Sequence, residues 1–186
     1  IAFSKHDSSK LYTYSNHVHL SIDEGHSWET ISPDLTRNDK SKLVSSGGPI
    51  TQDNTGVEYY ATIFAVDESP LQEGLIWVGS DDGLIHLTKD GGATWENVTP
   101  KKMPDWMMIN SIDASSFDSG TAYIAGTRYK LGDFTPYLYV TDDYGKNWKL
   151  ITNGIKDEHF TRVLRSDKVN KNILYAGTET GICLLY

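Results

Sequence analysis

Acidic and aromatic residues gather in a few turn-rich segments of this 186-residue chain, between stretches that alternate apolar and polar residues. Carboxylates beside aromatic rings suit carbohydrate recognition, because a sugar ring offers hydroxyls for hydrogen bonds and apolar CH faces for stacking. The sequence therefore nominates a carbohydrate-binding surface. Its candidate ligand-binding residues are Glu58, Tyr59, Tyr60, Trp106, Arg128, Tyr129, Glu158 and His159, and Asp53, Asp81 and Phe134 lie in the same segments.

Hydrolysis of a glycosidic bond would need two carboxyl groups, one of them with a raised pKa. They would stand about 5 to 5.5 Å apart for retention of configuration or about 6.5 to 9.5 Å apart for inversion. We nominate Asp82 and Asp133 as this catalytic pair, because each lies between the second and third strands of adjacent repeating units described below. These residues are compatible both with a hydrolase and with a non-catalytic binding protein.

Signatures of other chemistry are absent from the sequence, which has no Gly-x-Gly-x-x-Gly, Walker, His-Glu-x-x-His or Gly-x-Ser-x-Gly motif. His17 and His19 alternate along one expected strand, but two ligands without a third partner do not define a metal site. The single Cys183 lies in an apolar run and has no partner for a disulfide. We therefore expect neither a cofactor nor a metal.

Charge and hydropathy limit the partners. With 17 Lys and Arg against 25 Asp and Glu, the chain has a formal charge of −8, which repels phosphate backbones and anionic membrane surfaces, so nucleic acid is not an expected partner. No run approaches the roughly 18 apolar residues of a membrane-spanning helix, so no membrane insertion is expected. The chain begins at Ile1 without a signal-like segment, so we expect the native N-terminus to lie upstream.

One octet, with the pattern [Ser/Thr]-x-Asp-x-Gly-x-x-Trp, recurs three times. Each copy follows an apolar segment that alternates with period two, which predicts a hairpin. The Asp can accept backbone N–H bonds across the turn, the Gly supplies a positive φ, and the Trp can fold back over the strands. We therefore expect structural roles for Asp23, Gly25 and Trp28, for Asp90, Gly92 and Trp95, and for Asp143, Gly145 and Trp148.

The repeat extends upstream of each octet and predicts units of four strands. Such units occupy residues 1–32, 62–99 and 110–153, residues 162–186 supply three strands of a fourth, and residues 33–61 form a long insertion. Units of this kind, repeated at roughly 50 to 65 residues, are propeller blades, and closed propellers have about 4 to 8 blades. The predicted fold is all-β, an incomplete β-propeller of four-stranded antiparallel blades. The remaining blades would come from the full chain or from a self-association partner, and a four-blade closure is the alternative.

The octets resemble the Asp-box, or BNR, repeat of sialidases, xyloglucan-degrading glycoside hydrolases and Vps10/sortilin ectodomains, over nearly the whole chain. Residues 28–36 (WETISPDLT) and 75–83 (LIWVGSDDG) are similar to segments of bacterial secreted proteins labelled BNR-repeat glycosyl hydrolases or Vps10-domain proteins. Enzymes and receptors share this repeat. The resemblance implies an extracellular or periplasmic protein. Family sialidases also carry an arginine triad and a Phe-Arg-Ile-Pro motif; that motif is absent here.

Blade topology sorts the loops between two faces. The octets and the turns after each first strand share one face, and in the resembled hydrolases the boxes lie away from the substrate. The insertion at residues 33–61 and the loop at residues 127–136 are longer than usual and belong to the opposite face. Long loops on a rigid scaffold are where binding groups collect, so we expect the ligand surface there.

These observations predict a segment of a secreted glycosyl hydrolase or carbohydrate-binding propeller, with a glycan as its ligand. The alternative is a non-catalytic propeller of the Vps10/sortilin kind that binds a peptide or protein. A third interpretation is a scaffold domain for a function located elsewhere in the full chain.

Overall fold

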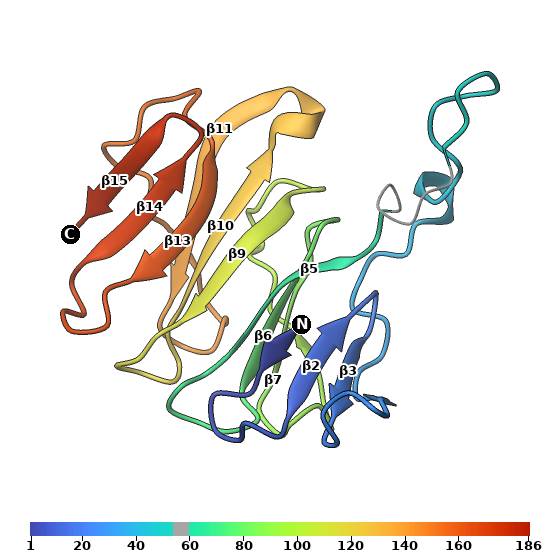
Figure 1. Ribbon diagram of the computed structural model, residues 1–186. Coiled ribbons are helices and arrows are strands. Elements are labelled where there is room, and N and C mark those ends of the chain that lie inside the picture. Colours follow the sequence, from blue (N-terminus) through green and yellow to red (C-terminus); the bar gives the residue numbers. More distant parts are fainter. Residues whose placement is uncertain (54–59) are drawn as a thin grey trace.

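The computed structural model describes residues 1–53 and 60–186. Its strands form three four-stranded sheets and one three-stranded sheet, each built from consecutive antiparallel strands in chain order. Figure 1 shows the four sheets side by side as successive blades. The predicted all-β fold, a partial β-propeller, is confirmed.

The strands are short and their order along the chain is their order across each sheet. The first sheet contains β1 (Ala2–Phe3), β2 (Leu11–Tyr14), β3 (Val18–Ser21) and β4 (Glu29–Thr30). The second contains β5 (Ile63–Glu68), β6 (Ile76–Ser80), β7 (Ile85–Thr88) and β8 (Glu96–Asn97). The third contains β9 (Met108–Ala114), β10 (Ala122–Arg128), β11 (Asp133–Thr141) and β12 (Lys149–Leu150), and the fourth contains β13 (Thr161–Ser166), β14 (Leu174–Thr178) and β15 (Gly181–Leu185). In the described part of the long loops lie the single-turn 3-10 helices η1 (Lys40–Lys42) and η3 (Tyr129–Leu131).

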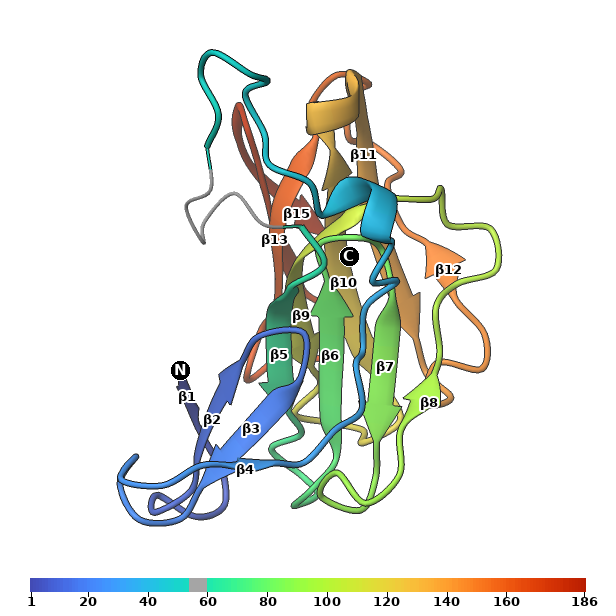
Figure 2. The same cartoon turned by 90° about the vertical axis from the view of Figure 1, so that its right-hand side faces the viewer.

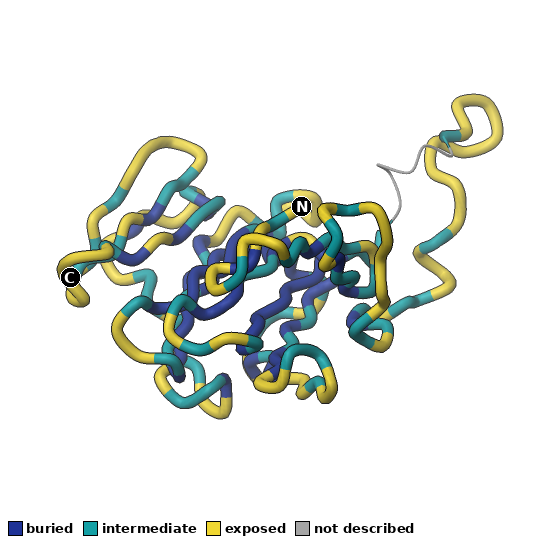
Figure 3. Tube along the Cα trace, turned by 60° about the horizontal axis from the view of Figure 1, so that its bottom comes forward, coloured by how far each residue is buried: buried dark blue, intermediate teal, exposed yellow. Residues whose placement is uncertain are grey.

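Hydrophobic side chains fill the spaces between successive sheets. Because alternate residues of a strand point to opposite faces, the two central sheets bury both faces, and all five residues of β6 are buried. Figure 3 shows this buried band running through the strands, with exposed residues in the loops. The three interfaces are centred on Tyr12, Val18 and Ile76; on Trp77, Ile109 and Ile124; and on Leu138, Leu164 and Ala176.

Each octet folds as a hairpin turn closed by its own polar groups. In the second octet, Asp90 accepts hydrogen bonds from the backbone N–H of Thr94 (2.9 Å) and from its hydroxyl (2.6 Å), and Gly92 N donates to the Thr88 hydroxyl. Asp23 and Asp143 accept the corresponding bonds from Ser27 and Asn147. The side-chain bond from Thr94 is the main reason that the pKa of Asp90 is lowered to about 2. This carboxylate is therefore an ionised acceptor within the turn.

The octet tryptophans also connect neighbouring sheets. Trp95 Nε1 donates to the carbonyl oxygen of Ile31 (2.9 Å), and Trp148 Nε1 donates to that of Val98 (2.7 Å). Ile31 and Val98 each follow the last strand of the preceding sheet. Trp28 is 40% exposed and donates instead to Gly25 of its own hairpin. We call the Trp95–Ile31 and Trp148–Val98 contacts the blade joints.

A second set of contacts connects the first strands of adjacent sheets. Asp67 in β5 accepts from the backbone N–H of Ala114 in β9 (2.8 Å), and Asp113 in β9 accepts from that of Ser166 in β13 (2.8 Å). Carboxylates at the ends of these strands therefore satisfy backbone donors of the next sheet. The sequence analysis did not single out either aspartate.

The octets and the long loops lie on opposite faces of the molecule. Figure 2 shows the turn between β3 and β4 and the turn between β7 and β8 at the bottom, and the insertion and the loop that carries η3 at the top. This is the arrangement expected from blade topology. The top face, formed by the insertion and by the η3 loop, is called the long-loop face below.

Candidate ligand-binding site

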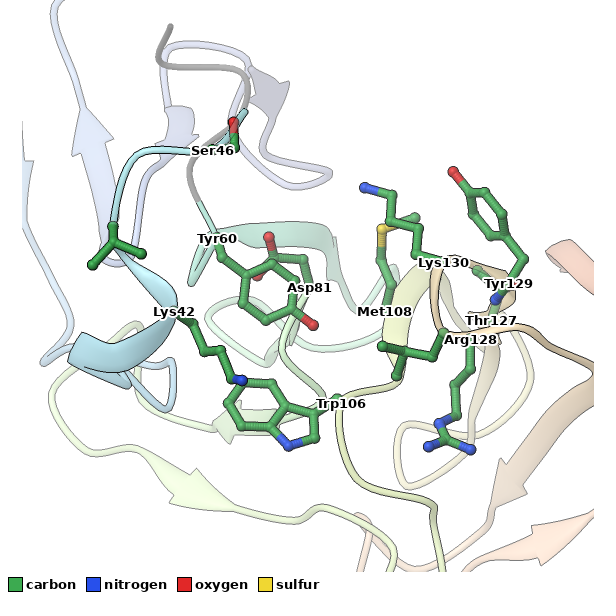
Figure 4. A pocket seen from close by; sticks show the side chains of 12 residues that line it. Lys42, Ser46, Tyr60, Asp81, Trp106, Met108, Thr127, Arg128, Tyr129 and Lys130 are labelled. Atoms are coloured by element: carbon green, nitrogen blue, oxygen red, sulfur yellow. The ribbon is translucent and has the colours of Figure 1, made fainter. Parts of the chain in front are cut away.

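A cavity of about 370 Å³ opens on the long-loop face, between the second and third sheets. Figure 4 shows its walls, which come from the insertion, from the turn after β6, from the link before β9, and from the loop between β10 and β11. Its volume falls within the range of small-ligand pockets, about 300 to 1,000 Å³. The lining residues are Lys42, Val44, Ser46, Tyr60, Asp81, Trp106, Met108, Thr127, Arg128, Tyr129, Lys130 and Leu131.

Two aromatic residues from different links form one wall of the cavity. Tyr60 stacks on Trp106 with 5.7 Å between ring centroids and 26° between ring planes. The guanidinium of Arg37 lies 5.2 Å from the Trp106 ring centroid, and Lys42 Nζ lies 5.9 Å from it. Tyr60, Trp106, Arg128 and Tyr129, which the sequence nominated separately, therefore meet at one cavity.

The backbone has a rare conformation at Trp106 and directly after Tyr60. Trp106 has φ of 60°, and Ala61, directly after Tyr60, has φ of 65°. Residues with a Cβ atom seldom adopt positive φ, and such strained positions concentrate at ligand sites. Asp81 holds the end of the insertion here, because its backbone N–H donates to Thr62 O and its carboxylate accepts from Thr62 N.

Asp81 is the acid that lines the cavity. It is 8% exposed, and this burial is the main reason that its pKa is raised to about 6; the neighbouring carboxylate of Asp82 raises it further, whereas the Thr62 N–H and Lys130 lower it. A carboxyl with this pKa holds its proton near pH 5 and can supply it to a bound ligand.

Asp82 does not line the cavity and instead binds the insertion. It is 1% exposed; one carboxylate oxygen accepts from the Ser80 hydroxyl and the other from the backbone N–H of Arg37 (2.7 Å). Its carbonyl oxygen accepts from Arg37 Nε (2.8 Å), and the same guanidinium pairs with Asp105 (2.8 Å). Of the two adjacent acids, the structure therefore directs Asp81 to the cavity, whereas the sequence favoured Asp82.

Asp133, the second acid of the nominated pair, sits in a hydrogen-bonded group at the start of β11. It pairs with Arg128 Nη1 (2.6 Å) and accepts from the Tyr137 hydroxyl (2.8 Å). Burial raises its pKa, but hydrogen bonds from Thr135, Tyr137 and Arg128 outweigh burial and hold the pKa below its ordinary value. Asp133 thus orients Arg128 at the edge of the cavity. A catalytic role for Asp82 and Asp133 stays a prediction.

A second aromatic cluster adjoins the cavity through Tyr129. Its ring stacks on Phe160 (5.3 Å between centroids, 15° between planes), and Phe134 approaches Phe160 at 5.8 Å. The Arg162 guanidinium lies 4.4 Å from the Tyr129 centroid and pairs with Glu179 (2.9 Å). Phe160 is buried, so Tyr129 and Phe134 form the accessible part of this cluster on the long-loop face.

The other nominated residues do not line the cavity. Glu158 is exposed and has φ of 71°, and His159 Nδ1 contacts the Thr180 hydroxyl (2.7 Å). Glu58 and Tyr59 lie outside the described residues. Sequence reasoning missed Lys42, Met108, Lys130 and Leu131, because nothing in the pattern distinguishes a cavity-lining lysine or methionine from an ordinary loop residue.

Within residues 1–53 and 60–186, no group of three or more His, Cys, Asp or Glu side chains is arranged to hold a metal ion. No helix in the same residues is long and apolar enough to cross a membrane.

Comparison with known proteins shows the fold. No protein-family model and no curated protein matches the chain. Among solved structures, an ancestral GH74 enzyme is similar with a TM-score of 0.67 and 18% identity over 98% of this chain, and the GH74 xyloglucanase from Xanthomonas campestris with a TM-score of 0.65 and 17% identity over 95%. The chain spans only 22% and 26% of these two proteins. The computationally designed Ika4 protein is similar with a TM-score of 0.51 and 9% identity, over 97% of this chain and 86% of its own.

Proposed function

We propose that the long-loop face is the carbohydrate-binding face of an extracellular or periplasmic Asp-box propeller, and that a glycan segment occupies the cavity. The observation that carries the proposal is the stacked pair of Tyr60 and Trp106 at a cavity that also holds Asp81 and Arg128. Aromatic rings can pack against the CH faces of a sugar while charged and polar groups bind its hydroxyls.

The size and the composition of the walls support a polymeric ligand. The aromatic surface continues from Trp106 past Tyr129 to the exposed Phe134, which packs against the buried Phe160, and it is longer than one sugar ring needs. The similar GH74 structures include a xyloglucanase, an enzyme named for a polysaccharide substrate. A polysaccharide is therefore a more suitable ligand than a free monosaccharide.

Hydrolysis belongs to the same proposal, with Asp81 added to the candidates Asp82 and Asp133. A proton donor for glycoside cleavage needs a raised pKa, and Asp81 is the cavity residue that has one. Its neighbour Asp82 has both oxygens engaged, so its role in this proposal is to hold the insertion in place.

Binding of a series of soluble oligosaccharides, measured by calorimetry, tests the proposal. Tyr60→Ala and Trp106→Ala should each weaken binding about tenfold, whereas Trp28→Ala on the opposite face should leave it unchanged. Urea unfolding of each variant verifies that the fold persists, and Tyr129→Ala serves as a second probe. A protein that binds no oligosaccharide but captures peptides would overturn the proposal in favour of the peptide-binding alternative.

Release of reducing ends from the bound oligosaccharide tests the hydrolytic part separately. Asp81→Asn should retain binding and lose at least a hundredfold in rate if Asp81 is the acid. If the unmodified protein binds the oligosaccharide without cleaving it, the hydrolytic part of the proposal is refuted and the protein is a carbohydrate-binding module.

A further inference from the structure

The charges around the cavity differ in sign from those of the chain as a whole. The chain has a formal charge of −8. Among the described residues, 1–53 and 60–186, the charged side chains that line the cavity are those of Lys42, Arg128 and Lys130 and the carboxyl of Asp81, and Arg37 lies over the Trp106 wall. A local excess of cations in an acidic protein concentrates anionic ligands at that place.

In the described part of the chain, the arginines of this group have carboxylate partners, whereas the lysines do not. Arg37 pairs with Asp105, and Arg128 pairs with Asp133, so their charges are largely compensated. Among residues 1–53 and 60–186, Lys42 and Lys130 form no ion pair within 4.0 Å. The two ammonium groups therefore stay available to an incoming anion.

The two lysines come from opposite walls of the cavity. Lys42 is the last residue of η1 in the insertion, and Lys130 is the middle residue of η3. Lys42 Nζ lies over the Trp106 ring, and Lys130 is close enough to Asp81 to lower its pKa. Figure 4 shows the side chains of both lysines beside the space that Tyr60, Trp106 and Met108 border. A ligand seated against the aromatic wall would thus place its substituents between two cations.

We propose that the glycan bound on the long-loop face is anionic, carrying carboxylate or sulfate groups that Lys42 and Lys130 recognise. This inference rests on the proposed function and adds the chemical class of the ligand. A lysine presents a compact charge with rotatable donors, which suits substituents spaced along a flexible polymer. The aromatic wall then binds the sugar ring, and the lysines select for its charge.

Three oligosaccharides of equal length test the inference by calorimetry: a galacturonate oligomer, a sulfated galactan oligomer and a neutral xyloglucan oligomer. The unmodified protein should bind at least one of the charged ligands about tenfold more tightly than the neutral one at low salt, and this preference should shrink at 0.5 M salt. The carboxylated and sulfated ligands distinguish the two sources of negative charge.

Substitutions of the two lysines test whether the preference for charged ligands arises at the cavity. Lys42→Gln and Lys130→Gln should each reduce affinity for the charged ligand about threefold to fivefold and leave that for the neutral one unchanged. Lys149→Gln on β12, an exposed lysine that does not line the cavity, is the matched control and should change neither affinity. Equal or tighter binding of the neutral ligand, with no effect of the two substitutions, would overturn this inference and leave the proposed function intact. Failure of all three ligands to bind would refute the proposed function itself.

Discussion

Trp148 of the third sheet donates a hydrogen bond through Nε1 to the carbonyl oxygen of Val98, the residue that follows the last strand of the second sheet, over 2.7 Å. The same indole packs edge-on against the buried Trp77 of the second sheet, with 6.1 Å between ring centroids. One side chain thus supplies both a directional bond and an apolar contact across a sheet interface. Trp95 makes the corresponding bond to Ile31 one sheet earlier.

A substitution that removes only the indole N–H donor of Trp148 measures how much this hydrogen bond contributes to the free energy of unfolding. Trp148→Phe retains an aromatic ring but leaves the Val98 carbonyl without this partner, and should lower the free energy of unfolding by about 1–2 kcal/mol. Trp28→Phe is the matched control, because Trp28 is exposed and donates within its own hairpin, and should cost less than about 0.5 kcal/mol. Urea titration measures both; equal losses would contradict a special role for the joint.

Alanine substitutions at two adjacent glycines of the second octet distinguish the cost of backbone strain from the cost of a steric clash. Gly91 (φ 71°) and Gly92 (φ 104°) both have positive φ, but a Cβ at Gly91 would meet no atom within 4 Å, whereas a Cβ at Gly92 would lie 2.6 Å from Ile31 O. Gly91→Ala should therefore cost about 1 kcal/mol of unfolding free energy from the conformation alone. Gly92→Ala should cost about 1–3 kcal/mol more. Similar losses for the two variants would show that the sheets separate easily at this point.

The carboxylate of Asp113 should be a large contributor to the contact between the third and fourth sheets. Its side chain is 6% exposed, accepts from Ser166 N and from the Ser166 hydroxyl, and lies 3.4 Å from Lys168 Nζ. Asp113→Ala leaves the Ser166 donors unpaired and should lower the unfolding free energy by about 2–4 kcal/mol. Asp142→Ala, at an exposed carboxylate, should change it by less than about 0.5 kcal/mol in the same urea titration.

The buried carboxyl of Asp81 should make stability depend on pH. Its folded-state pKa of about 6 exceeds the ordinary value of 3.8, so the folded state binds more protons than the unfolded state between these values. The contribution of Asp81 to stability is therefore complete below about pH 4 and is lost as the pH rises through 6, by on the order of 2–3 kcal/mol. Asp81→Asn should flatten the unfolding free energy across this range. Parallel curves for the two proteins would contradict the assignment.

The same carboxyl should affect the binding of an anionic oligosaccharide. The charge of Lys130 lowers the pKa of Asp81 and the charge of Asp82 raises it, while Arg128 lines the same cavity. Protonation of Asp81 removes a negative charge from the cavity, so affinity for the galacturonate oligomer, which stays ionised at pH 5, should rise as the pH falls from 7 to 5. Calorimetry at the two values should show this change for the unmodified protein and little change for Asp81→Asn. Weaker binding at pH 5 would contradict it.

Much of the fold follows from local sequence. Short apolar segments such as residues 75–79 form strands, and the residue types of the octets form turns closed by Asp and Ser or Thr, because both depend on neighbours along the chain. The joints could not be predicted, since the partner of Trp148 lies 50 residues away and is a backbone carbonyl. Sequence alone also could not separate Asp81 from Asp82, because two adjacent acids differ only in the direction that the turn gives each side chain.

The placement of the blade joints has a consequence for engineering. The octet turns lie on the face opposite the insertion and the η3 loop, and neither joint contains a residue of 40–53 or 129–132. Residues 40–53 and 129–132 can accordingly be replaced by foreign sequences, as the variable loops of an antibody are, while the sheets that carry them stay connected by both joints.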